Sequence, residues 1–186
     1  MRYGNLYRTI ELNKDFLTKI DNTISNMDLQ IKKSLVNKKE SNRRVSKQAW
    51  IRDASLCKYF FGIGQKVNEV CKWNFDLKGI EPIQYGIYSE GGKYDWHVDQ
   101  GSKIRLKGGS VRKISMTLFM NNPDEYEGGE FDLELFHPEK KPRYETFKLK
   151  KGSAIFFQSD VWHRVRPVSL GVRKSLVAWY SGPTFR

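Results

Sequence analysis

His97 and Asp99 lie two residues apart in the stretch GKYDWHVDQG, residues 92–101. In an extended strand alternate side chains share a face, so the imidazole and the carboxylate would project together while Trp96 and Val98 pack on the opposite face. Such a pair can hold a metal ion, although an isolated His-X-Asp match also fits a surface ion pair. Residues elsewhere in the chain have to decide between these two interpretations.

A second histidine and an arginine occur in the last quarter of the chain. In the alternating segment HRVRPV, His163 and Val165 share one face and Arg164 and Arg166 share the other. The segment VRKSLVAWY that follows places four residues on a common face: Arg173, Ser175, Val177 and Trp179. If these faces point inward, an arginine shares an interior with two histidines and an aspartate.

The two histidines, the aspartate and the arginine together suit a metal site that also binds an anion. Two histidines and one carboxylate form a facial triad that suits non-heme Fe(II) and leaves coordination positions open for reactants. A buried arginine needs an anionic partner, because an unpaired charge is costly and a guanidinium binds a carboxylate through two parallel hydrogen bonds. A cosubstrate with two carboxylates would satisfy both the metal and the arginine.

Taken one at a time, the same residues have simpler interpretations. His163 fits a hydrogen-bonded core histidine, and Arg173 fits a charge on an exposed strand. Tyr94 and Trp179 fit ordinary packing inside a barrel. His137, in LFHPEKKPR, is most simply an exposed loop residue, with the role of distal metal ligand as its alternative. The combination, rather than any one residue, favours the metal site.

Residues 80–183 resemble the 2-oxoglutarate and Fe(II)-dependent dioxygenases, and among them the prolyl 4-hydroxylases and their small bacterial and phage relatives. The resemblance rests on YSEGGKYDWHVD, YEGGEFDL and WHRVRPVSLGVRKSLVAWYSGP, which occur in the family's order. It implies that His97, Asp99 and His163 hold Fe(II), that 2-oxoglutarate chelates the iron, and that Arg173 binds its distal carboxylate. It also implies O2 as the oxidant, release of succinate and CO2, and ascorbate as a candidate reductant.

Further residues match the prolyl branch of this family. The resemblance places Tyr88 near the cosubstrate, Tyr94 and Trp179 beside the substrate proline, and Arg112 at a substrate backbone carbonyl. One position departs from the pattern: Phe119 stands where a tyrosine often offers its hydroxyl to the distal carboxylate. We therefore expect Thr117 to supply that hydroxyl.

The elements that must position these residues fall into two groups. Helical spacing of apolar residues predicts a helix over 14–27, after the cap Asn13, and a second helix that Asp53 caps. From residue 81 the chain shows eight short strand-like segments divided by polar or glycine-rich turns. This order favours an α+β domain built on a double-stranded β-helix, a jelly-roll variant, with the N-terminal helices packed on its larger sheet.

The length of 186 residues predicts one domain, 1–186, with a helical support over about 1–78 and a catalytic β-core over about 80–186. The N-terminal residues lack the apolar run of a signal peptide, and no segment reaches the ~20 apolar residues of a membrane span. These features predict a cytoplasmic protein with no membrane partner. Cys57 and Cys71 are expected to be free thiols.

The charge is strongly positive, with 33 Lys and Arg against 21 Asp and Glu, a net charge of +12. Seven basic residues lie in 32–47, which is interpreted as a solvated or partly ordered loop, and five lie in 100–113, where they could rim the site. The expected partner is a proline-containing peptide or protein, with acidic residues flanking the proline. The alternatives are a nucleic-acid demethylase of the same superfamily and a non-catalytic basic binding module.

Overall fold

In the computed structural model, residues 6–34, 41–100, 109–135 and 141–184 are described. They contain two α-helices, α1 (Lys14–Asn26) and α2 (Ala54–Val70), and a 3-10 turn at Pro123–Glu125. Among these residues, neither helix has the length and apolar character that a membrane-crossing helix requires.

The strands form two main sheets and one small hairpin sheet. The larger sheet has the order β1-β12-β8-β15-β6-β4-β2, with β5 also paired to β15. Its strands are β1 (Tyr7–Glu11), β2 (Lys32–Lys33), β4 (Lys47–Ile51), β5 (Gly79–Ile80), β6 (Ile83–Tyr88), β8 (Ser110–Phe119), β12 (Ser153–Gln158) and β15 (Arg173–Pro183).

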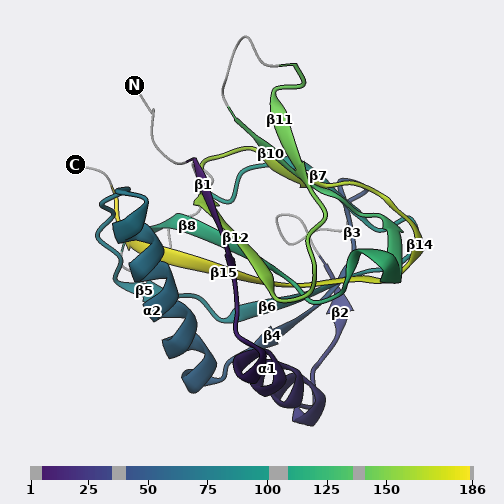
Figure 1. Ribbon diagram of the computed structural model, residues 1–186, viewed down its shortest axis with the longest axis horizontal. Coiled ribbons are helices and arrows are strands. Elements are labelled where there is room, and N and C mark those ends of the chain that lie inside the picture. The colour runs from purple at the N-terminus through teal and green to yellow at the C-terminus, as the bar shows by residue number, and fades with distance from the viewer. Residues whose placement is uncertain (1–5, 35–40, 101–108, 136–140, 185–186) are drawn as a thin grey trace.

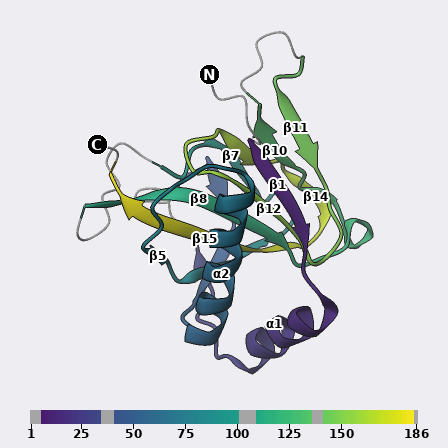
Figure 2. The same cartoon turned by 60° about the vertical axis from the view of Figure 1, so that its left-hand side comes forward.

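The smaller sheet has the order β11-β10-β13-β7-β3. Its strands are β3 (Arg44–Val45), β7 (Lys93–His97), β10 (Phe131–Glu134), β11 (Tyr144–Phe147) and β13 (His163–Val165). A two-stranded sheet pairs β9 (Tyr126–Gly128) with β14 (Val168–Gly171). Figures 1 and 2 show the helices on one side of the larger sheet and the strands β7, β10 and β11 on its other side.

The alternation of side chains along β8 and β15 separates two buried clusters. Met116, Leu118 and Leu176 join Ile20 of α1 and Phe60 of α2 in the cluster on the helix side. The second cluster lies between the two main sheets and is made of ten buried residues: Tyr88, Phe119, Phe131, Leu133, Phe147, Ile155, Phe157, Val161, Val165 and Val168. One face of the larger sheet therefore contacts the helices, and the other faces the smaller sheet across an interior that can hold a site.

Both predicted helices are present, and both caps are confirmed. The side chain of Asn13 accepts a hydrogen bond from the backbone N–H of Phe16 at 2.8 Å, and Asp53 accepts one from Leu56 at 2.7 Å. In α2, Gly64 marks a close approach, because a Cβ at this position would overlap the ring of Tyr180 on β15. Glycine thus lets the helix backbone lie directly against the sheet.

The first 78 residues contribute more than helices. β1 forms one edge of the larger sheet, β2 and β4 extend its other side, and β3 pairs with β7 in the smaller sheet. The interpretation of 32–47 as a solvated or partly ordered loop is therefore wrong at 32–33, 44–45 and 47, which lie in β2, β3 and β4. The reason is that the partner strands β6 and β7 offer backbone groups to segments too short to show alternation.

Candidate active site

The predicted metal-binding residues come together. The ligand atoms of His97, Asp99 and His163 all lie within 4.8 Å of one another. His97 and His163 are direct cross-strand partners on β7 and β13, and Asp99 follows β7 by two residues. Asp99 is close to both, with Nε2 of His163 at 3.5 Å from Oδ2 and Nε2 of His97 at 3.9 Å from Oδ1.

Backbone carbonyls fix the orientation of both imidazoles. Nδ1–H of His97 donates to the carbonyl of Asp95 at 2.8 Å, and Nδ1–H of His163 donates to the carbonyl of Val161 at 3.0 Å. A carbonyl only accepts, so the proton resides on Nδ1 in each ring and Nε2 keeps its lone pair for a metal. Histidines that bind a metal through one ring nitrogen usually donate the other N–H to a carbonyl or carboxylate in this way.

The carboxylate is held from the larger sheet. Ser115 on β8 donates its hydroxyl to Oδ2 of Asp99 at 2.7 Å and lies 2.9 Å from the hydroxyl of Ser159. Burial alone would raise the pKa of Asp99, but the two nearby histidines, Arg112 and the Ser115 hydroxyl lower it to about 2. The group is therefore an anion at neutral pH, as a metal ligand has to be.

His97 is kept neutral by its surroundings. Burial and the neighbouring imidazole of His163 lower its pKa to about 3. The ring of Tyr94 stacks on it with centroids 3.5 Å apart and an angle of 15°, and the guanidinium of Arg44 lies 4.7 Å from the Tyr94 ring centroid. Together, the three candidates offer two imidazole nitrogens and one carboxylate, a donor set that fits Fe(II).

Arg173 is the first residue of β15, and Trp179 lies six residues further along the same strand. Arg173 is 1% exposed, and its guanidinium carbon lies 5.4 Å from the ring centroid of Tyr88 and 5.3 Å from that of Phe119. Nη1 donates to Ser175 at 3.2 Å, whereas Nε and Nη2 have no hydrogen-bond partner among the described residues. Burial lowers the pKa of this guanidinium, and Tyr88 and Tyr126 offset part of that effect.

Thr117 lies on the same face, between Ser115 and Phe119 of β8. It is buried and pairs with Val177 of β15, whereas Ser115 pairs with Trp179. The inward face of the larger sheet thus runs from the end that holds Asp99 to the end that holds Arg173, with Thr117 between them.

Arg112 and Trp179 meet at the outer end of this face. Nε and Nη2 of Arg112 each donate to a carboxylate oxygen of Glu81 at 2.6 Å, and the guanidinium carbon lies 3.8 Å from the Trp179 ring centroid. The indole N–H of Trp179 is buried with no partner among the described residues. Of the nitrogens of Arg112, only Nη1 is not engaged by Glu81.

Three residues near the site were not singled out in the sequence. Trp50 on β4 is 40% exposed, and its ring lies 6.0 Å from that of Trp179. Glu81 lies between β5 and β6, and Arg44 comes from β3, where it donates from Nη2 to Gln84 at 2.7 Å. Sequence reasoning missed Trp50 and Arg44 because their strands were not predicted, and no local pattern marks Glu81 as a partner of Arg112.

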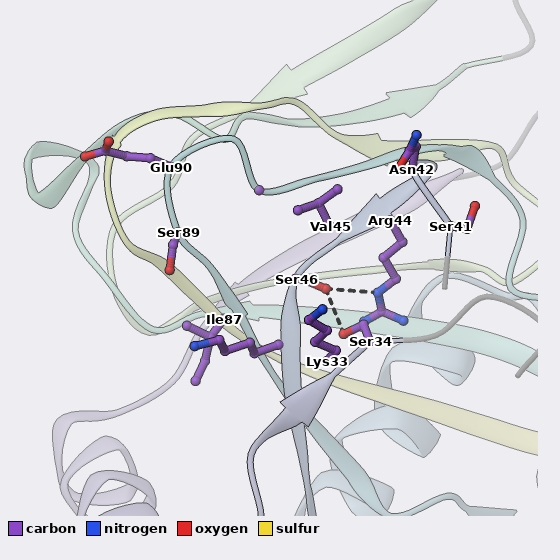
Figure 3. Close-up of a pocket in the computed structure, with 12 residues that line it drawn as sticks. Lys33, Ser34, Ser41, Asn42, Arg44, Val45, Ser46, Ile87, Ser89 and Glu90 are labelled. Atoms are coloured by element: carbon purple, nitrogen blue, oxygen red, sulfur yellow. Dashed lines mark hydrogen bonds between the residues drawn. The ribbon is translucent and has the colours of Figure 1, made fainter. Parts of the chain in front are cut away.

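A separate hollow of about 480 Å³ lies beside Arg44, between β2, β3, β4 and the end of β6 (Figure 3). Ser46 joins two of its walls, because its hydroxyl donates to Ser34 and accepts from Nε of Arg44. His97, Asp99 and His163 are not among its lining residues, so the hollow is distinct from the candidate metal site.

Two predicted regions lie outside the described residues. They are His137, the alternative distal ligand, and 101–108, which holds three of the five basic residues of 100–113.

Comparison with known proteins agrees with this geometry. Residues 83–181 match the family model of the 2OG-Fe(II) oxygenase superfamily. A PKHD-type hydroxylase of Acaryochloris marina is 37% identical over 102 residues, which are 55% of this chain and 42% of that protein. The chain therefore matches less than half the length of this relative.

Solved structures share the fold over nearly the whole chain. A prolyl-4-hydroxylase of Pseudomonas putida superposes with a TM-score of 0.69 at 16% identity, covering 94% of this chain and 91% of that one. The viral collagen prolyl hydroxylase of Paramecium Bursaria Chlorella virus-1 also gives 0.69, at 21% identity, covering 96% and 97%. The fold is thus that of the double-stranded β-helix oxygenases, and the chain belongs to the 2OG-Fe(II) oxygenase superfamily.

Proposed function

We propose that this protein is an Fe(II)- and 2-oxoglutarate-dependent dioxygenase that hydroxylates prolyl residues in a peptide or protein and releases succinate and CO2. One observation carries the proposal: a two-histidine, one-carboxylate cluster from the smaller sheet and a buried arginine of the larger sheet, with Nε and Nη2 unpaired among the described residues, belong to the same interior between the two sheets. The names of the related proteins support prolyl hydroxylation over other oxygenase reactions.

In this proposal, His97, Asp99 and His163 hold the iron through Nε2, a carboxylate oxygen and Nε2. Bound Fe(II), with O2 and 2-oxoglutarate, supplies the oxidising chemistry that replaces a C–H bond of the substrate with C–O–H. The protein contributes orientation: the carbonyls behind each imidazole and the hydroxyl of Ser115 hold the three ligands in place.

The cosubstrate lies between this cluster and Arg173. The unpaired Nε–Nη2 edge of Arg173 binds the distal carboxylate, because that edge presents two parallel donors to two oxygens. Tyr88 and Thr117 line the space between the two ends, and the rings of Tyr88 and Phe119 keep water from the guanidinium.

The substrate proline occupies the outer end, between Tyr94 and Trp179. A flat pyrrolidine ring packs well on aromatic faces, and the indole N–H of Trp179 and Nη1 of Arg112 remain available to substrate carbonyls. The net charge of +12 favours acidic residues beside the proline.

The test is succinate release from 2-oxoglutarate in air, with ascorbate as reductant, against proline-containing peptides and methylated oligonucleotides. We expect a 16 Da gain on proline peptides and no reaction of the oligonucleotides. His163→Ala should abolish turnover while the purified variant keeps a cooperative unfolding transition. Demethylation of the oligonucleotides with every proline peptide inert would overturn the prolyl assignment, and the absence of Fe(II) binding would overturn the enzyme itself.

A further inference from the structure

Tyr126 has a buried hydroxyl close to the guanidinium of Arg173, and its O–H has no acceptor among the described residues. The residue begins β9 and is 3% exposed. A buried polar group left unpaired is unfavourable, so native proteins seldom keep one without a use. In the sequence, Tyr126 begins the stretch YEGGEFDL, which belongs to the family resemblance, but no binding role was assigned to it.

The local backbone places Tyr126 beside Arg173. Tyr126 pairs with Gly171 across the β9–β14 sheet, two residues before Arg173. Gly129, with a φ of +65°, shows how tightly these residues pack, because a Cβ there would lie 3.0 Å from Cδ of Arg173 and 3.2 Å from Cε2 of Tyr126. Glycine at this position lets the phenol and the guanidinium approach each other.

Lys148 contacts both the backbone and the ring of Tyr126. Lys148 donates its ammonium to the backbone carbonyl of Tyr126 at 2.8 Å and lies 4.7 Å from the ring centroid. Burial raises the pKa of Tyr126, and the charge of Arg173, with a hydrogen bond from its guanidinium to the phenol oxygen, offsets only part of this effect. The group is therefore a neutral phenol at physiological pH, which can donate its proton in a hydrogen bond.

Two unpaired sets of donors thus occur side by side in the buried interior. Arg173 offers the Nε–Nη2 edge and Tyr126 offers one O–H. A carboxylate has about four lone-pair positions on its two oxygens, so it can accept from both side chains at once. A neutral ligand would leave the guanidinium charge uncompensated.

We propose that Tyr126 is a further cosubstrate-binding residue, whose hydroxyl donates to the distal carboxylate of 2-oxoglutarate alongside Arg173. The inference rests on the proposed function and deepens it, because it assigns the hydroxyl that completes the carboxylate site.

Thr117 is less well placed for this role. It pairs with Val177, four residues along β15 from Arg173, and Phe119 lies between it and the arginine end of β8. The hydroxyl of Thr117 therefore faces the middle of the cosubstrate, whereas Tyr126 adjoins the guanidinium itself.

The experiment is calorimetric binding to the Mn(II)-loaded protein without O2, so that no turnover occurs. Two ligands are compared: 2-oxoglutarate and 2-oxopentanoate, which keeps the metal-chelating end but lacks the distal carboxylate. The variants are Tyr126→Phe, Thr117→Val and, as a matched control, Tyr85→Phe, which removes a phenol hydroxyl on the helix-facing side of β6.

Tyr126→Phe should weaken 2-oxoglutarate about 10- to 100-fold, the usual effect of losing a hydrogen bond to a charged group, and leave 2-oxopentanoate unchanged. Tyr85→Phe should change neither affinity, and Thr117→Val should have a smaller effect than Tyr126→Phe. Equal weakening of both ligands by Tyr126→Phe would indicate a structural role and overturn the inference, as would unchanged affinity for 2-oxoglutarate. If the unmodified protein binds Mn(II) but not 2-oxoglutarate, the proposed function fails first.

Discussion

Two arginines on adjacent strands of the larger sheet face the same interior, and they differ in one respect. Arg112 of β8 gives Nε and Nη2 to Glu81 in a two-pronged ion pair, while the same edge of Arg173 on β15 has no partner among the described residues. Arg173 is also the more buried, at 1% exposure against 15% for the Arg112 side chain. The more exposed guanidinium, that of Arg112, has a carboxylate partner. The more buried guanidinium, that of Arg173, costs more to desolvate and has none among the described residues.

Arg112 thus has a structural ion pair beside its proposed contact with the substrate, whereas the buried charge of Arg173 has no anionic partner among the described residues. The Arg112–Glu81 pair joins β8 to the segment before β6 and supports the ring of Trp179. At Arg173, an uncompensated buried charge destabilises the empty protein by several kcal/mol at most, and a bound carboxylate removes that cost. An unpaired arginine in a folded interior therefore indicates the place and the charge of a ligand.

The largest effect should follow from Arg173→Met. We expect 2-oxoglutarate affinity to fall by at least about 100-fold, since a two-pronged charge-assisted contact is lost. The stability of the empty protein should stay level or rise, because a buried charge gives way to an apolar side chain of similar length. Calorimetry and thermal unfolding measure the two quantities. A loss of stability together with unchanged affinity would show that Arg173 is structural after all.

Glu81→Gln should have the opposite pattern. The substitution keeps the shape but removes the negative charge, so we expect a loss of about 1–2 kcal/mol in the free energy of unfolding, measured in urea. Affinity for 2-oxoglutarate should not change, because Glu81 belongs to the outer end of the face. A cosubstrate defect equal to that of Arg173→Met would erase the distinction between the two arginines.

Trp50→Ala should affect peptides and spare the cosubstrate. Trp50 is exposed and lies 6.0 Å from Trp179, so its removal should raise the peptide KM about fivefold, the equivalent of ~1 kcal/mol. Decarboxylation of 2-oxoglutarate without peptide should persist. The control is Trp162→Ala, since Trp162 is similarly exposed, at 41% against 40%, but directly precedes β13 of the smaller sheet. An equal effect of both variants would mean that Trp50 has no specific role.

The smallest effect concerns the charge around the substrate proline. Peptides with Asp or Glu beside the proline should react a few-fold faster than those with Lys, and the ratio should approach one as the salt concentration rises. Because Glu81 neutralises Arg112, Glu81→Gln should enlarge this ratio. A ratio that does not respond to salt would argue for shape, rather than charge, as the basis of selection.

The sequence predicted that His97, Asp99 and His163 would come together, because strand alternation places them. His97 and His163 point inward because each sits at the right parity in a strand, and the parity can be counted from the letters. The two helices were predicted for a similar reason, since Asn13 and Asp53 make local capping bonds within three residues.

Contacts between residues that are distant in the sequence could not be predicted from alternation or capping. The strand β3 has only two residues, and it forms because its backbone pairs with β7. No pattern in the sequence therefore predicted that Arg44 would lie over the ring of Tyr94. Likewise, Glu81 meets Arg112 across 31 residues, and Tyr126 meets Arg173 through a two-stranded sheet that the turn residues conceal.

The strand β15 carries both ends of the site. Arg173 and Trp179 are six residues apart on one uninterrupted strand, and at ~3.3 Å per residue their backbones are separated by about 20 Å. A single inserted residue would turn one of the two toward the helices, so this spacing cannot be adjusted in small steps. If Arg173 binds the cosubstrate and Trp179 contacts the substrate, as proposed, this spacing fixes the distance between the two binding positions. Changes in substrate range are therefore expected to arise in other strands of the larger sheet, such as β4, which pairs with β6 and where side chains can vary without altering that distance.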